Sequence, residues 1–517
     1  MTKKELYLYI LVLESQQKYL ACVKLLSTEL AVSLCKVEAE LKSLVLKYMH
    51  LAGQTDSVLD LCRNGLSSTP DDWKIHLTFI ESLYSTIIEQ ADEQPVKNLE
   101  EVEEFKEALS FLEGLQKTTD GKIKGPLLAE IELFFKFGLF EKITPLIVQY
   151  FKRFGKVISF FEDVRKFLDV IPNDSKDSFL KSLSNEAEIE ESGQISSFKK
   201  RINYYKIRFC LISVFESEKR TLFKKLLLKE YFDGLELGKD LKVTERQYGD
   251  DCLVLAVLLI IEQYHHSQDS RLLYEALYLL ESGVKKSTYN FQMKIMLIRI
   301  YLLLGVSQPV VTHSLSLDVK QILLDTLTYI YADDFERIAP IDVAGQLVKK
   351  ALAIYNSNEK ETPEMLIQAY KFGTYSKIPE FQNFKQRLSN SIQQAISIRQ
   401  VALTEILALS SPESFKHLEV YVVGLDVSKL VVTDVIIDKM SDNRDRTMNV
   451  SWKSGSGGQS FFELTSVSSD VIPTDKRSWI KTYGAIPIIV KAWVARETID
   501  VAALRLIEGL SESVSIL

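Results

Sequence analysis

Residue types that could do chemistry gather most densely between Glu245 and His266, in the stretch "ERQYGDDCLVLAVLLIIEQYHH". Two adjacent carboxylates, Asp250 and Asp251, could act as general acid and base, and His265 and His266 could transfer protons or bind a metal. Adjacent histidines point to different faces of a helix, however, so they cannot both bind one metal ion from the same helix. The His-x-x-x-His spacing that one helix face requires is absent from this stretch.

The same residues fit the two ends of a buried helix. The carboxylates follow Gly249 at the point where the apolar run begins, and acidic side chains there interact favourably with free backbone amides and the helix dipole. The histidines stand in the last turn, where positive charge is favourable. We therefore predict a buried helix with Asp and His at its ends, and no active site.

Other candidate motifs are weak. "GSGG" at residues 455–458 lacks the Lys and Ser/Thr of a phosphate-binding loop, and it predicts a flexible loop. The remaining histidines are isolated in the sequence, without the spacing of zinc ligands; they are His50, His76, His313 and His417. The sequence therefore predicts no catalytic, cofactor-binding or metal-binding residue in this chain.

The densest positive charge lies between Lys199 and Lys229, interleaved with aromatic residues. The candidates for an anion-binding patch are Lys199, Lys200, Arg201, Lys206, Arg208, Lys224 and Lys225. They can be interpreted as the solvated faces of two helices whose apolar sides hold Ile202, Tyr205 and Phe209, which is the usual role of a charge run. The alternative is a surface that binds phosphate groups or an acidic protein.

The elements that must position these residues are helices. Hydrophobic residues make up 46% of the 517 residues, while glycine (21) and proline (12) are scarce, and apolar residues recur at intervals of three and four up to about residue 425. A single core rarely exceeds about 250–300 residues. The sequence therefore predicts an all-α chain made of several domains or a repeat array.

A recurring register favours the repeat array. One helix ends at a residue that is usually small, and five positions later the next helix presents a small or β-branched residue. The pairs are Gln17/Cys22, Gly53/Val58, Gly138/Ile143, Gly305/Val310 and Gly373/Ile378. Some spacings approach the 34-residue tetratricopeptide period and others do not. We predict a degenerate, tetratricopeptide-like α-solenoid followed by a small irregular C-terminal region.

Composition suggests the domain organisation. Residues 1–185 and 198–425 are predicted as two helical-repeat halves, separated by an acidic linker at 186–197. Residues 426–517 form the C-terminal region, with a flexible loop at 441–460 and a terminal helix. Residues 426–470 are compatible with two strands or with a further helix.

The bulk composition limits the cellular setting. The net charge of −7 excludes a protein that coats nucleic acid, and it predicts no sequence-specific nucleic-acid binding. Five distant cysteines without a C-x-x-C motif indicate reduced thiols. The longest apolar run, residues 252–261, is half the ~20 residues of a membrane helix. We expect a soluble cytoplasmic protein.

Several segments, taken together and in this order, resemble the non-catalytic auxiliary subunit of the NatB N-terminal acetyltransferase, a family also associated with mitochondrial distribution and morphology. The segments are "TPDDW" (69–73), "KGPLLAEIEL" (124–133), "RQYGDDCLVLAVLLI" (246–260), "NFQMKIMLIRIYLLLG" (290–305), "ETPEMLIQAYKFGTYSKIPEF" (361–381) and "SDNRD" (441–445). Family members carry further repeats before the position of Met1, which implies a truncated chain or a divergent short member.

The resemblance implies a scaffold that wraps a catalytic subunit of the GNAT class in a heterodimer. That partner would bind acetyl-CoA and acetylate N-termini that start with Met-Asp, Met-Glu, Met-Asn or Met-Gln, and the basic cluster would dock the complex on the ribosome. This chain lacks the acetyl-CoA loop of such enzymes. The alternatives are a PCI-type scaffold subunit, whose solenoid ends in a winged helix, and an enzyme in its own right.

Overall fold

A computed structural model describes residues 2–35, 39–90, 102–189, 193–212, 217–335, 341–407, 412–426, 428, 430, 434–455, 458–466 and 477–495. Over these ranges the chain is helical, with no strand; an isolated parallel bridge joins Ser391 and Ser441. The all-α prediction is confirmed. None of the helices in these ranges is long and apolar enough to cross a membrane.

The chain divides into two compact units. The first comprises residues 1–220 and 453–458, and the second comprises residues 221–452 and 459–517. The division therefore falls inside a helix, α13 (Ser217–Leu237), and not in the predicted linker at 186–197. The acidic stretch "NEAEIEESGQISS" instead covers the end of one helix and the start of the next, and these two helices pack together.

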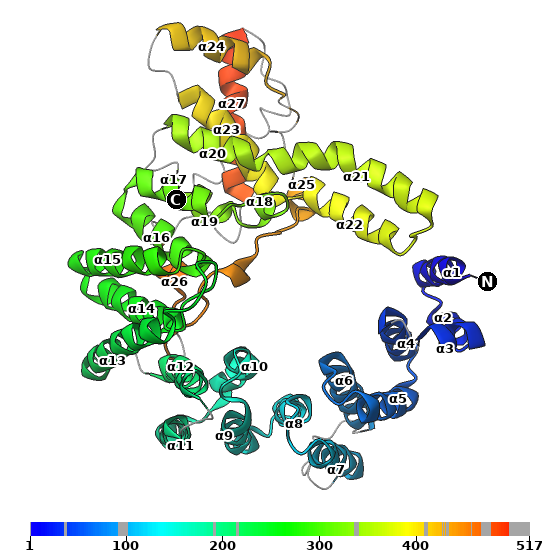
Figure 1. The fold of residues 1–517 in the computed structure, drawn as a ribbon. Coiled ribbons are helices and arrows are strands. Elements are labelled where there is room, and N and C mark those ends of the chain that lie inside the picture. Colours follow the sequence, from blue (N-terminus) through cyan, green and yellow to red (C-terminus); the bar gives the residue numbers. More distant parts are fainter. Residues whose placement is uncertain are drawn as a thin grey trace. The chain divides into compact units, whose positions relative to one another are not determined.

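The first unit consists of helices that follow one another in chain order (Figure 1). Their bounds are α1 Lys3–Ser15, α2 Tyr19–Leu26, α3 Glu29–Cys35, α4 Ala39–Leu51, α5 Thr55–Ser68, α6 Trp73–Gln90, α7 Glu103–Thr118, α8 Gly125–Lys136, α9 Ile143–Phe154, α10 Phe160–Val164, α11 Lys176–Glu188 and α12 Gln194–Leu211. Short 3₁₀ helices follow α8 and α10, at Phe140–Lys142, Arg165–Val170 and Asn173–Ser175. Each helix packs mainly on its near neighbours in sequence, as expected for a solenoid.

The second unit continues the same pattern and then departs from it. Its helices after α13 are α14 Asp250–Ser267, α15 Arg271–Lys286, α16 Phe291–Leu304, α17 Ser307–Ser316, α18 Leu323–Thr326, α19 Tyr329–Phe335, α20 Ile341–Ala351, α21 Ala353–Phe372, α22 Lys377–Ser389, α23 Ile392–Leu407, α24 Pro412–Val423, α25 Asp434–Asp438, α26 Phe461–Leu464 and α27 Arg477–Ala495, with a 3₁₀ turn at Arg446–Met448. The late helices return to earlier ones: α26 packs on α14, and α27 packs on α23 and α24.

The predicted five-residue register corresponds to a helix–turn–helix with a left-handed residue in the turn. The first member of every pair has a positive φ, from 55° at Gln17 to 75° at Gly138. Glycine is the usual choice because a Cβ is strained in this conformation. Four of the second members are fully buried between the paired helices: Cys22, Val58, Ile143 and Val310. The five-residue register in the sequence therefore correctly predicted the positions of these turns between paired helices.

The C-terminal segment predicted as a flexible loop makes specific hydrogen bonds within each unit. In the second unit, the amide of Asp445 donates to the Thr326 carbonyl at 3.0 Å, and the Tyr329 hydroxyl donates to the Asp445 carbonyl at 3.0 Å. In the first unit, the amide of Gly455 donates to the Cys210 carbonyl at 2.8 Å. Of the two alternatives predicted for residues 426–470, the described residues form helices and no strand pair: α25 lies in the first segment and α26 in the second, and both are short. The expected terminal helix beyond residue 495 lies outside the described residues.

Candidate functional site

The helix predicted between the two carboxylates and the two histidines is α14. It begins at Asp250 and ends at Ser267, with His265 and His266 exposed in its last turn. Asp250 does not cap it, however. Its carboxylate is buried and accepts hydrogen bonds from Ser287 Oγ at 2.6 Å and Asn290 Nδ2 at 2.8 Å. Burial raises the pKa of Asp250, and these two hydrogen bonds oppose the rise. Asp250 thus fastens the turn between α15 and α16 to α14.

One of the isolated histidines, His313, serves a packing role. His313 Nε2 lies 2.9 Å from Glu281 Oε1, which also accepts a hydrogen bond from the Tyr301 hydroxyl at 2.8 Å. These three residues tie α15, α16 and α17 together. Among the described residues, no three His, Cys, Asp or Glu side chains form a group that could hold a metal ion.

The basic cluster does not form one exposed face. On α12, Lys200 and Lys206 are buried, with relative exposures of 2% and 8%, and their ammonium groups lie 5.8 Å from the ring centres of Phe151 and Phe161. Such positions favour a cation through the ring quadrupole. The side chains of Lys199, Arg201 and Arg208 are partly buried on the same helix. The solvated-face interpretation therefore does not describe α12.

In the second unit, the remaining members of the cluster lie on α13. Lys224 forms an ion pair with Glu275 of α15 at 2.9 Å, while Lys225 is exposed. Because a buried or paired cation is poorly placed to meet an external phosphate, only the exposed part of α13 keeps the predicted anion-binding character.

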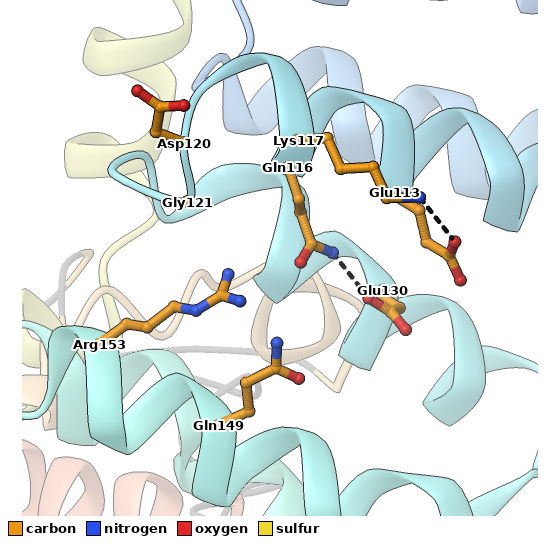
Figure 2. Close-up of a pocket in the computed structure, with 8 residues that line it drawn as sticks. All are labelled: Glu113, Gln116, Lys117, Asp120, Gly121, Glu130, Gln149 and Arg153. Carbon is orange, nitrogen blue, oxygen red and sulfur yellow. Dashed lines mark hydrogen bonds and ion pairs between the residues drawn. The ribbon is translucent and has the colours of Figure 1, made fainter.

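A polar pocket of about 540 Å³, which sequence reasoning missed, lies within the first unit. We call it the turn pocket, because it adjoins the turn between α7 and α8. Figure 2 shows its walls: one face of α7, one residue of α8, and one face of α9. The lining residues are Glu113, Gln116, Lys117, Asp120, Gly121, Glu130, Gln149 and Arg153.

Helix periodicity explains why these side chains converge. Glu113, Gln116 and Lys117 on α7 are spaced by three and four residues, as are Gln149 and Arg153 on α9, so each set lies on one helix face. Glu130 enters from α8, which packs against both. The packing of these three helices therefore places opposite charges and amide groups around one cavity.

Glu130 is the most enclosed ionisable group of the turn pocket. Gln116 Nε2 donates a hydrogen bond to its carboxylate at 2.7 Å. Burial raises the pKa of Glu130, and the hydrogen bond from Gln116 and the charge of Arg153 lower it. A ligand that is cationic or donates a hydrogen bond would stabilise the charged form of this carboxylate.

Arg153 lies against the turn at Gly121. Gly121 has a φ of +62°, and a Cβ at this position would come within 2.9 Å of the Arg153 guanidinium. Glycine suits this backbone conformation, and its lack of a side chain leaves room for the guanidinium. The guanidinium therefore lies directly against the turn.

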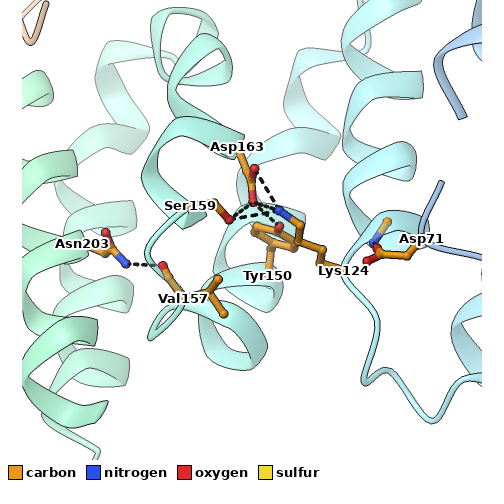
Figure 3. A network of polar contacts seen from close by, with 8 residues as sticks. Asp71, Lys124, Tyr150, Val157, Ser159, Asp163 and Asn203 are labelled. Carbon is orange, nitrogen blue, oxygen red and sulfur yellow. Dashed lines mark hydrogen bonds and ion pairs between the residues drawn. The ribbon is translucent and has the colours of Figure 1, made fainter. Parts of the chain in front are cut away.

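A polar network holds the other end of the same turn (Figure 3). The Lys124 ammonium donates to Asp163 Oδ2 at 2.9 Å and to Ser159 Oγ at 3.0 Å, and the Tyr150 hydroxyl donates to Asp163 Oδ2 at 2.8 Å. The amide of Gly125, at the start of α8, donates to Asp71 Oδ1 at 2.8 Å. Asp71 thus caps α8 from 54 residues away.

Asn203 extends the polar contacts to α12, since its Nδ2 donates to the carbonyls of Gly155 at 2.7 Å and Val157 at 2.9 Å. Two motifs that carry the sequence resemblance, "TPDDW" and "KGPLLAEIEL", therefore meet at the beginning of α8. The only sequence signals of the turn pocket were the Asp-Gly turn at 120–121 and Glu130 within an apolar run.

Comparison with known proteins gives the family. Residues 73–446 match the family model described as "N-acetyltransferase B complex (NatB) non catalytic subunit". The human "N-alpha-acetyltransferase 25, NatB auxiliary subunit" is 29% identical over 484 residues, which cover 87% of this chain and 48% of the human protein. The Schizosaccharomyces pombe "N-terminal acetyltransferase B complex subunit arm1" is 31% identical over 281 residues, covering 53% of this chain and 35% of that protein.

Solved structures share the fold. A chain of "The NatB Acetyltransferase Complex Bound To bisubstrate inhibitor" superposes with a TM-score of 0.63 at 16% identity, covering all of this chain and 59% of that one. A chain of the complex "Bound To CoA and MES" gives 0.51 at 15% identity, covering 92% and 58%. The chain spans about half the length of the human relative. With the family model matched over most of its helices, the chain belongs to the family of non-catalytic subunits of the N-acetyltransferase B complex, NatB.

Proposed function

We propose that this chain is a scaffold that wraps and stabilises a GNAT-type catalytic subunit of NatB. That partner binds acetyl-CoA and acetylates N-termini beginning with Met-Asp, Met-Glu, Met-Asn or Met-Gln, in the cytoplasm. Family membership and the helical-repeat fold support this function. The structural observation that carries it is a partly apolar groove in the second unit.

This groove has a volume of about 700 Å³ and lies among α21, α22 and the residues leading into α18. Its apolar lining includes Ile322, Ile354, Met365, Phe381 and Phe384. Met365 is 44% exposed and Phe384 is 36% exposed. Exposed apolar side chains gathered around a hollow are typical of a protein-binding surface.

The rim of the groove indicates the chemistry of the partner. Glu361 and Glu380 line it, and both are exposed. Glu380 also pairs with Lys377 of its own helix at 2.9 Å. An apolar helix face of the catalytic subunit would pack in the groove. A lysine or arginine at the border of that face would form an ion pair with Glu361.

The double variant Met365→Glu/Phe384→Glu should weaken binding of the catalytic subunit by roughly thirtyfold or more, because charges would replace apolar contacts at the centre of the interface. Isothermal titration with the purified catalytic subunit would measure this. Val243→Glu is the matched control, since Val243 is an apolar residue with 78% exposure outside the groove. Unchanged affinity of the double variant would show that the groove is not the binding surface.

We also propose that α13 docks the complex on the ribosome. Its exposed stripe consists of Leu222, Lys225, Lys229 and Phe232, spaced by three and four residues, with Leu222 and Phe232 60% and 58% exposed. Lysine contacts to RNA phosphates are independent of sequence and sensitive to salt. The buried lysines of α12 are not needed for this interaction.

Lys225→Glu/Lys229→Glu should reduce co-sedimentation with ribosomes at low salt and lower the slope of log affinity against log salt by roughly 1.5, the contribution of two phosphate contacts. The control is Lys285→Glu/Lys286→Glu, which reverses two exposed lysines of α15. If both double variants sediment like the unaltered chain, α13 does not dock on the ribosome.

A further inference from the structure

We propose that the turn pocket is a binding site for a short extended peptide segment of another protein, held by its main chain and by one basic and one acidic side chain. This inference is independent of the proposed scaffold function. It rests on the groups that the turn pocket offers and on how α7, α8 and α9 hold them (Figure 2).

Two of these groups lack a partner within the part of the chain that the structure describes. The amide of Gln149 and the guanidinium of Arg153 make no hydrogen bond or ion pair there. Both belong to one face of α9, and the guanidinium lies against the turn at Gly121. An arginine with free donors in a pocket suits a carboxylate or a carbonyl oxygen of a ligand.

The opposite side of the turn pocket offers an acceptor. Glu130 receives a hydrogen bond from Gln116, and burial raises its pKa despite that bond and the charge of Arg153. A lysine or arginine side chain of the ligand would give this carboxylate a direct ion-pair partner. The turn pocket therefore suits a ligand that carries a positive group and a negative group at separate points.

Other ligand classes fit less well. Three carboxylates in the lining, those of Glu113, Asp120 and Glu130, disfavour a free phosphate. The two basic side chains in the lining disfavour a metal ion. The polar lining disfavours a lipid chain.

The amide groups favour a peptide over a free amino acid. The Gln116 and Gln149 side chains each carry a donor and an acceptor, which match the alternating N–H and C=O groups of an extended main chain. A volume of about 540 Å³ accommodates several residues and lies within the usual range of binding pockets.

The test uses the full chain and fluorescein-labelled peptides in which one lysine and one aspartate are separated by none, one, two or three glycines. Fluorescence anisotropy should detect saturable binding of at least one peptide. Glu130→Gln and Arg153→Met should each weaken it by about tenfold, the typical effect of losing one charge-assisted contact. Lys152→Met, which alters the exposed neighbouring residue on α9, should leave binding unchanged.

A second variant separates geometry from charge. Gly121→Ala retains every charge but forces the Arg153 guanidinium to move, so it should also weaken peptide binding. Thermal unfolding of each variant would establish that α7–α9 remain folded. The proposal is wrong if no peptide of the set binds, if the Glu130 and Arg153 variants bind like the unaltered chain, or if free lysine and aspartate compete as well as the peptide does.

Discussion

Asp163→Ala should lower the free energy of unfolding of the α8–α10 region by about 3 kcal/mol, because it removes one acceptor from three donors at once. Those donors are the Lys124 ammonium, the Tyr150 hydroxyl and the Ser159 hydroxyl, at 2.9, 2.8 and 3.2 Å from Asp163 Oδ2. Tyr150 is fully buried, and its burial and the nearby Asp163 charge raise its pKa. Without Asp163 its hydroxyl would be buried without this partner.

A graded series identifies the cause of this loss. Asp163→Asn retains an oxygen that can accept from Tyr150 and Ser159 but loses the charge opposite Lys124, so it should cost about half as much. The Lys124 side chain is 34% exposed, and water therefore weakens the ion pair. Asp174→Ala, at an exposed aspartate of the same unit, should change stability by less than about 0.5 kcal/mol.

Hydrogen exchange of the backbone amides of α8, α9 and α10 would measure the effect locally, since a chain with two units need not unfold in one step. Faster exchange confined to these helices is the expected result. If Asp163→Ala exchanges at the same rate as the unaltered chain, the network does not stabilise this region.

Arg399→Ala should destabilise the packing of α27 on α23 by about 4 kcal/mol. The Arg399 side chain is fully buried and donates to the carbonyls of Ile480 at 2.6 Å, Ala395 at 2.7 Å and Leu430 at 2.8 Å. Burial lowers its pKa to about 10, so it remains protonated near neutral pH. Its removal would leave three buried carbonyl oxygens without this donor and a cavity where the side chain was.

Arg399→Lys should recover part of the stability, because one ammonium cannot reproduce the planar fork of donors. Limited proteolysis and hydrogen exchange of α27 would report the loss. Lys439→Ala, at an exposed residue of the same unit, is the control. Protection of α27 that survives Arg399→Ala would contradict the role assigned to this guanidinium.

Gly484 of α27 contributes to the same contact between α27 and α23. A Cβ at Gly484 would come within 2.7 Å of the Leu430 carbonyl oxygen and 3.1 Å of Arg399 Nε. The close approach of α27 thus depends on a residue without a side chain, which is a reason for a glycine inside a helix.

The sequence was sufficient for features that depend on neighbouring residues. Apolar periodicity predicted the helices, and the five-residue register located turns such as Gly53 and Gly305, because a left-handed turn residue and the buried residue after it are close in the chain. The absence of catalytic motifs agrees with membership of a non-catalytic family. Composition did not indicate the division inside α13, because an acidic stretch has the same composition in a linker and at the ends of two packed helices.

Only the tertiary structure decided what each polar side chain does. Asp250 was expected to cap its own helix, yet its partners, Ser287 and Asn290, lie 37 and 40 residues away. The basic cluster could not be divided into buried and exposed members before α12 was seen to pack its lysines over aromatic rings. The turn pocket unites residues of three helices and one turn. A one-dimensional pattern specifies which face of a helix is apolar, but the partner of a charge on that helix depends on which distant residues the packed repeats bring within hydrogen-bonding distance.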